Sequence, residues 1–314
     1  MNIQRKTSAA LLSILSNALL VIIKLVVGIL GGSVSIMSEA IHSGIDLLAA
    51  CIAWLAILVS AKPADMNHPY GHGKFENLSG TIEALLIFLA AVWIIYEAMH
   101  KLLVPQPIEK LELSILVMGL SAFVNLIISN YLMKIGKETD SIALTADAWH
   151  LRTDVYTSVG VMSALIVILG GKYFYPNANL IWMDPCAAII VAILIIQAAY
   201  KLTKQASHDL VDVSLPDIEV QWLCNYMRSL APIIRGFHNL RTRKAGSYRF
   251  IEMHMVVDGN MTVNVSHEIT KRITREVIAH FAGSYIVIHV EPCNQQWPSN
   301  ACSPNCIKGC LVRT

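Results

Sequence analysis

VSIMSEAIHSGIDLLAACIAWLAILVS, residues 34–60, decides the fold class of this 314-residue chain. The stretch is long enough to cross a bilayer as a helix, because about 20 apolar residues are sufficient for one crossing. It nevertheless contains His42 and Asp46. Ionisable side chains are costly inside a membrane and are usually functional there. The stretch therefore predicts a transmembrane helix that contributes to a polar site.

Five further apolar stretches of similar length occur in the first two thirds of the chain. The six stretches run over residues 8–30, 34–60, 78–102, 113–133, 142–169 and 181–202. The composition agrees, with 55% hydrophobic and only 15% charged residues, where soluble domains carry about 25% charged residues. The net charge of +2 gives no reason to expect a nucleic-acid partner. We therefore predict an all-α bundle of six transmembrane helices over residues 1–203, within a lipid bilayer.

The distribution of Lys and Arg predicts the orientation of this bundle. With the N-terminus in the cytoplasm, eight basic residues flank the cytoplasmic ends of the spans and three flank the outer ends. Basic residues concentrate on the cytoplasmic side of membrane proteins. Six crossings return the chain to the starting side, so we expect both termini in the cytoplasm.

Hydropathy changes after Lys204. Residues 217–228 and 263–281 are typical of helices, and residues 233–242, 248–258 and 285–290 are typical of strands. The order α-β-β-α-β predicts a small α+β domain over residues 204–292, in which helices pack on a sheet. Residues 293–314 form a Cys-rich tail that we expect to be unfolded without a ligand.

A second His-xxx-Asp pair, His150 and Asp154, lies in the fifth apolar stretch. Residues four apart share one face of a helix, and at 1.5 Å per residue both pairs reach depths of roughly 12–18 Å. Two imidazoles and two carboxylates suit tetrahedral Zn²⁺, and two negative charges balance a dication. The pairs predict one metal site shared by two helices. The alternative is two unrelated pairs that stabilise helix packing.

Two other charged residues of the spans have simpler interpretations. Asp147 lies one turn before His150 and is expected to support it without touching the metal. Lys24 is expected to extend its ammonium group toward the membrane interface.

Four segments resemble the cation diffusion facilitator family, and the resemblance covers nearly the whole chain, from Asn17 to Cys293. The segments are SEAIHSGIDLLA at 38–49, PADMNHPYGHGKFE at 63–76, TADAWHLRTDVYTS at 145–158 and FHNLRTRKAGSYRFIEMHM at 237–255. The similarity is greatest to the bacterial branch that exports ferrous iron and zinc. It implies a homodimer in a bacterial inner membrane, exchange of divalent metal ions for protons, and a ferredoxin-like, metallochaperone-like cytoplasmic domain. His42 departs from that branch, where Asp occupies the position, and is similar to animal zinc transporters, so the selectivity stays open.

The resemblance also assigns three further groups of residues. A metal site in the loop after the second stretch would use Asp65, His68 and His72. A zinc cluster at the dimer interface would use His238, His254, His267, His289 and Glu291, the last in place of Asp. A charged pair that holds the dimer near the membrane would use Lys74 and Asp212.

The tail holds four of the seven cysteines: Cys293, Cys302, Cys306 and Cys310. Cytosolic thiols stay reduced, so a metal site built from soft ligands and an incidental tail are both open.

The sequence therefore predicts an efflux transporter for a divalent transition metal. Zn²⁺/H⁺ antiport from the cytoplasm fits best, since histidine titrates near neutral pH, and Fe²⁺, Cd²⁺ and Co²⁺ are further candidate substrates. Zn²⁺ is also expected as a structural or regulatory ion, with no organic cofactor. A membrane metalloenzyme is not expected, because neither an HExxH motif nor another recognisable catalytic base occurs. A metal-gated receptor without transport would not need ligands at the membrane midplane.

Overall fold

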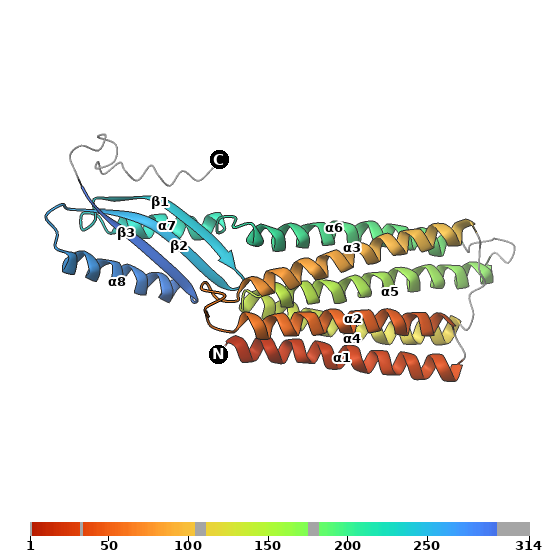
Figure 1. The fold of residues 1–314 in the computed structure, drawn as a ribbon. Coiled ribbons are helices and arrows are strands. Elements are labelled where there is room, and N and C mark those ends of the chain that lie inside the picture. Colours follow the sequence, from red (N-terminus) through yellow and green to blue (C-terminus); the bar gives the residue numbers. More distant parts are fainter. Residues whose placement is uncertain (1, 32–33, 104–110, 175–181, 294–314) are drawn as a thin grey trace. The chain divides into compact units, whose positions relative to one another are not determined.

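The computed structural model describes residues 2–31, 34–103, 111–174 and 182–293. The chain divides into two compact units, Met1–Ser207 and His208–Thr314. Six long helices build the first unit and lie side by side (Figure 1). They are α1 (Asn2–Gly31), α2 (Val34–Ser60), α3 (Lys74–Leu103), α4 (Leu111–Glu138), α5 (Ile142–Phe174) and α6 (Met183–Leu210). The prediction of a six-helix bundle is therefore confirmed.

Five of the six helices are longer than the apolar stretches that predicted them, and α2 matches its stretch. The shortest, α2, has 27 residues, which corresponds to about 40 Å and exceeds a hydrocarbon core of about 30 Å. Turns of largely polar residues lengthen several helices at their ends. For example, α3 begins at Lys74 rather than at residue 78. Over the described residues, α1, α3, α4 and α6 contain segments long and apolar enough to cross a membrane, and α2 contributes the shorter apolar run Asp46–Ser60.

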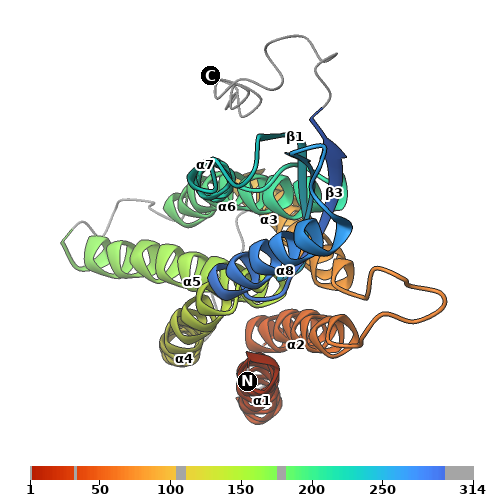
Figure 2. The ribbon, with the colours of Figure 1, turned by 90° about the vertical axis from the view of Figure 1, so that its left-hand side faces the viewer.

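Two clusters of buried side chains hold the bundle together. One joins α1, α2, α4 and α5 and includes Ile57, Leu132 and Leu144. The other joins α3, α5 and α6 and includes Ala84 and Ala146. Figure 2 views the bundle from one end and shows α1 next to α2 and α4 next to α5. Because α5 belongs to both clusters, it is the helix around which the bundle is organised.

The second unit is a three-stranded sheet with two helices. Its elements are α7 (Asp217–Ser229), β1 (Gly236–Ala245), β2 (Tyr248–Val257), α8 (Val263–His280) and β3 (Ser284–Pro292). The strand order is β1-β2-β3, with β1 antiparallel and β3 parallel to β2. The predicted order α-β-β-α-β is confirmed. β1 starts later than predicted, at Gly236, because hydrogen-bonded turns occupy the residues before it.

Alternation along β2 separates the two faces of the sheet. Ile251, Met253 and Met255 are buried in one core with Leu223 of α7 and Ile273 of α8. Both helices therefore cover the same face. Successive residues of a strand point to opposite faces, so His254 belongs to the face away from the helices.

Candidate metal sites

The helix bundle contains a buried cluster formed by α2 and α5. Asp46 Oδ1 lies 2.9 Å from His150 Nε2, and Asp154 completes a group in which one donor atom per residue lies within 4.8 Å of the others. Asp46 and His150 are both 4% exposed. A carboxylate only accepts hydrogen bonds, so Nε2–H of His150 donates to Asp46. A bound cation would take the place of this proton.

His42 is the fourth residue predicted for this cluster. It lies on α2 one turn before Asp46, and residues four apart share a helical face. Its side chain lies outside the described residues. The structure therefore brings together three of the four predicted ligands, from residues 104 positions apart in the chain.

Lys24 does not reach toward the interface, and that prediction was wrong. The residue is 5% exposed, and its ammonium group donates a 2.7 Å hydrogen bond to Ser43 Oγ of α2. The hydroxyl offers an acceptor inside the bundle, so the charge stays between the helices. Ser43 follows His42 directly in the sequence.

A second cluster lies in the loop between α2 and α3 and contains Asp65, His68 and His72. His72 Nδ1 lies 3.2 Å from the carbonyl oxygen of Pro63, and its Nε2 lies 3.3 Å from Asp65 Oδ2. The carbonyl only accepts, so Nδ1 carries a proton and Nε2 is the nitrogen available to a metal. Backbone N–H groups of His68 and Asn67 donate to Asp65 and hold the pKa of its carboxyl below the usual value. Asp65 is therefore anionic at neutral pH.

The second unit carries a row of histidines across its sheet. His238 of β1 pairs with His254 of β2, which pairs with His289 of β3. Glu291 serves all three, because its oxygens lie 3.4 Å from His238 Nε2, 2.7 Å from His254 Nδ1 and 3.6 Å from His289 Nε2. The side chain of His289 is 65% exposed. This cluster lies on the sheet face opposite α7 and α8.

The remaining predicted residues are not members of these clusters. His267 is exposed on α8, which covers the other face of the sheet. Lys74 opens α3 in the first unit, whereas Asp212 lies in the second unit with Oδ1 3.5 Å from Arg243. Cys293 ends the described chain as a free thiol. The other three tail cysteines, Cys302, Cys306 and Cys310, lie outside the described residues.

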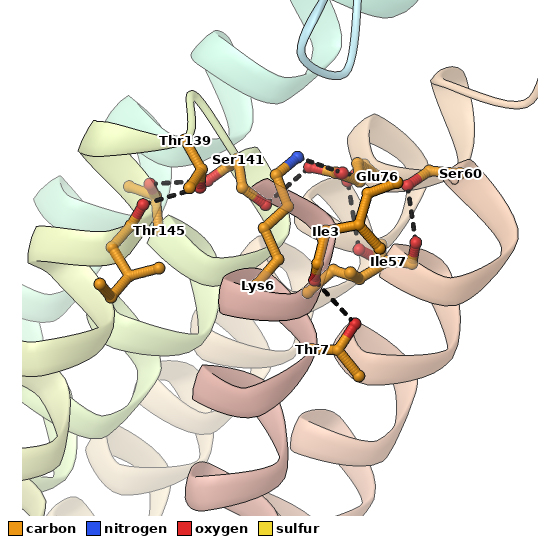
Figure 3. A network of polar contacts seen from close by, with 11 residues as sticks. Ile3, Lys6, Thr7, Ile57, Ser60, Glu76, Thr139, Ser141 and Thr145 are labelled. Atoms are coloured by element: carbon orange, nitrogen blue, oxygen red, sulfur yellow. Dashed lines mark hydrogen bonds and ion pairs between the residues drawn. The ribbon is translucent and has the colours of Figure 1, made fainter. Parts of the chain in front are cut away.

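A buried polar network was not predicted from the sequence (Figure 3). Glu76, in the first turn of α3, accepts hydrogen bonds from Lys6 at 2.8 Å, from Ser60 at 3.0 Å and from Ser141 at 2.6 Å. Lys6 belongs to α1, Ser60 ends α2 and Ser141 directly precedes α5. The network ties four helices together at the end of the bundle where α1 begins. A Glu two residues before an apolar stretch was the only signal in the sequence.

A bundle with a buried imidazole–carboxylate cluster, joined to a sheet with a second such cluster, defines a membrane transporter of metal cations. Residues 10–211 match the cation efflux transmembrane domain, and residues 215–293 match the cytoplasmic domain of cation efflux proteins. The chain belongs to the cation efflux family, the cation diffusion facilitators, and transports divalent metal ions. The predicted family is confirmed.

Two relatives are similar to this chain over most of its length, and a solved structure is similar to its C-terminal part. An uncharacterized transporter of Synechocystis sp. is 35% identical over 263 residues, which cover 83% of this chain and 82% of the relative. The cation-efflux pump FieF of Cronobacter sakazakii is 29% identical over 286 residues, 91% of this chain and 92% of the pump. The metal-bound C-terminal domain of the CzcD transporter from Thermotoga maritima is 30% identical to this chain. The match covers 26% of this chain and 95% of that domain, with a TM-score of 0.24.

Proposed function

We propose that the chain exports Zn²⁺ from the cytoplasm in exchange for protons, as a homodimer in a bacterial inner membrane. The contact between Asp46 and His150 carries this proposal, because it joins a metal ligand and a titratable ligand inside the bundle. Both termini would be cytoplasmic. Residues 1–203 would transport, residues 204–292 would sense metal, and residues 293–314 would form the tail.

One cluster with two alternative occupants is sufficient for exchange. Without metal, a proton on His150 Nε2 bonds to Asp46. A cation needs a neutral imidazole with a free lone pair on Nε2, so metal binding displaces that proton. When the bundle opens to the outside, protons return and the metal leaves. Metal and proton therefore compete for the same atoms and travel in opposite directions.

The donor set favours zinc over larger ions. Imidazole nitrogens and carboxylate oxygens are common ligands of Zn²⁺ in four-coordinate sites. Asp46, His150 and Asp154 supply three such donors, and His42 supplies the fourth in this proposal. Fe²⁺, Cd²⁺ and Co²⁺ share enough of this chemistry to be further substrates.

The loop cluster and the sheet cluster would bind metal for regulation. In the loop, Nε2 of His72 and the ionised Asp65 face each other and suit a dication. On the sheet, the His238, His254 and Glu291 cluster has the nitrogen and oxygen donors of a zinc site. A second copy of the chain would bring His267 to this face, and Lys74 and Asp212 would hold the two copies together near the membrane.

Metal flux into sealed proteoliposomes tests the proposal. Zn²⁺ outside and a lower pH inside should drive Zn²⁺ uptake with loss of internal protons, and Asp154→Asn should abolish both. Competition with Fe²⁺, Cd²⁺ and Co²⁺ would rank the substrates. Zn²⁺ uptake without proton movement would rule out antiport. If the wild type took up none of these ions, the proposed function would be ruled out.

A further inference from the structure

Helix α3 carries two buried carboxyl groups with opposite surroundings. Glu76 is 2% exposed and Glu83 is 0% exposed. They lie seven residues apart, which places them two turns apart on the same face of the helix. Helix position and burial are thus matched, and the two residues differ in what surrounds them.

The charge of Glu76 is compensated. Lys6 and Ser60 donate to Oε1, and Ser141 donates to Oε2 (Figure 3). Neither oxygen of Glu83 has a hydrogen-bond partner among the described residues. The same holds for both oxygens of Asp147 on α5, a residue 1% exposed. A buried carboxylate without a partner strongly destabilises the fold.

The packing of α3 on α5 brings Glu83 and Asp147 to the same level. Both helices begin at the same end of the bundle (Figure 1), where Ser141 donates to Glu76. Seven residues along α3 and six along α5 both correspond to roughly 9–10 Å of rise. The following Ala84 and the preceding Ala146 pack in one cluster. The two carboxyl groups also act on each other electrostatically.

The helices approach closely just before this level. A Cβ atom at Gly80 would lie 2.6 Å from Cγ2 of Ile142. Glycine therefore permits the contact that brings the two carboxyl groups together.

Helix α1 adds polar groups at this level. The hydroxyl of Ser13, a residue 0% exposed, lies near the Asp147 carboxyl without the geometry of an ordinary hydrogen bond. Asn17 follows one turn later on the same face of α1 and is also buried. Neither the Ser13 hydroxyl nor the Asn17 amide nitrogen has a hydrogen-bond partner in the described part of the chain. Three helices thus contribute buried polar side chains.

We propose that Glu83 and Asp147 form a second divalent-cation position within the bundle, with Ser13 as a further oxygen donor. The inference deepens the proposed function. Two neighbouring buried carboxylates repel each other, and a dication between them neutralises both charges. Asp147 lies three residues before His150, so this position is one helical turn from the Asp46, His150 and Asp154 cluster. It lies between that cluster and the Glu76 network.

The donor set favours a stepping position, at which the ion binds briefly before it moves on, over a site that holds the ion tightly. Its donors are oxygens, whereas the neighbouring cluster adds imidazole nitrogen, which Zn²⁺ prefers together with carboxylate. Conduction needs sites that bind well enough to attract the ion and weakly enough to release it. A cation held by Glu83 and Asp147 would move on to the stronger cluster.

Zinc stoichiometry tests the inference independently of transport. The full chain in detergent would carry Asp46→Asn and Asp154→Asn, and ⁶⁵Zn²⁺ bound at saturation would be counted. Adding Glu83→Gln should remove one Zn²⁺ per protomer, and adding Asp147→Asn in its place should do the same. Adding Glu76→Gln, the matched buried carboxyl, should leave the count unchanged. If the correctly folded Glu83→Gln and Asp147→Asn proteins bind as much Zn²⁺ as their parent, the second position is overturned. A pair that holds only protons would give this result.

Flux then separates this inference from the proposed function. In the otherwise wild-type chain, Glu83→Gln should raise the Zn²⁺ concentration for half-maximal uptake by about tenfold, the lower range for losing a supporting metal contact. A wild type without flux would sink the proposed function while the stoichiometry still decides on the second position. An unchanged half-maximal concentration would refute the stepping role.

Discussion

Two imidazole–carboxylate clusters of similar composition occupy opposite environments in this molecule. The Asp46, His150 and Asp154 cluster lies between helices, with Asp46 and His150 both 4% exposed. The His238, His254 and Glu291 cluster lies on an open sheet face, with His238 28% exposed. Surrounding water can stabilise the charges of the second cluster, whereas the first must balance its charge internally. In the proposed function, metal and protons replace each other in the buried cluster, and they need not do so on the sheet.

The largest expected difference between the clusters concerns flux. Asp154→Ala should lower Zn²⁺ flux by more than about 100-fold, beyond the range for losing an indirect contact. His254→Ala should leave flux at saturating Zn²⁺ within about threefold. Uptake into proteoliposomes measures both, and equal insertion of the two variants is the control. Wild-type flux in Asp154→Ala would break the assignment.

A buried and an exposed ion pair should also differ in how much each contributes to the free energy of unfolding. Glu76→Ala leaves Lys6 buried without this carboxylate, so the free energy of unfolding should fall by about 3–5 kcal/mol. The matched surface pair, Arg5 with Glu138, has side chains 52% and 39% exposed, and Glu138→Ala should cost at most about 1 kcal/mol. Thermal unfolding in detergent compares the variants. Equal losses would show that burial of the Glu76 network contributes nothing.

Loss of the sheet cluster should change sensitivity to metal. His254→Ala should raise the Zn²⁺ concentration for half-maximal flux by about tenfold, as expected for loss of a metal contact. His100→Ala, an exposed histidine at the other end of α3, is the control and should change nothing. Titration of flux against free Zn²⁺ gives the result. Identical curves for the two variants would leave the sheet cluster without a regulatory role.

His42→Asp sharpens the comparison within the buried cluster. Replacing imidazole by carboxylate adds negative charge and a ligand that binds through one or two oxygens, so larger ions should be accepted. The ratio of Cd²⁺ to Zn²⁺ flux should rise several-fold. Removal of a group that titrates near pH 6.5 should also alter the pH profile between about pH 5.5 and 7.5. If ratio and profile both stay the same, His42 is not a selectivity ligand.

The smallest effect is expected for the tail. Truncation after Pro292 removes four cysteines and should leave maximal flux intact, with weaker uptake at low Zn²⁺. Flux at low and saturating Zn²⁺ tests this expectation. A folded but inactive truncation would instead make the tail part of the transport mechanism.

The helices and three residues of the buried cluster could be predicted from the sequence, because both leave local patterns. Apolar length marked the six helices, and the His-xxx-Asp spacing marked both halves of the buried cluster. The row formed by His238, His254 and His289 could not be derived from spacing, because it depends on the register of three strands.

Contacts between residues far apart in the sequence could not be predicted from local patterns either. The contacts of Lys24 with Ser43 and of Lys6 with Glu76 join residues 19 and 70 positions apart. Which charged side chain meets which partner is decided by helix packing. For that reason Lys24 was wrongly predicted to reach the interface.

Location of the transported ion tests the central claim most directly. Crystals of the full chain grown in lipid with Zn²⁺ would be measured with X-rays above and below the zinc absorption edge. We predict an anomalous peak bonded to His150 Nε2 and flanked by Asp46 and Asp154, lost in Asp154→Asn while the sheet peak remains. Peaks at the loop and sheet clusters with none between α2 and α5, in protein that transports Zn²⁺, would contradict the account.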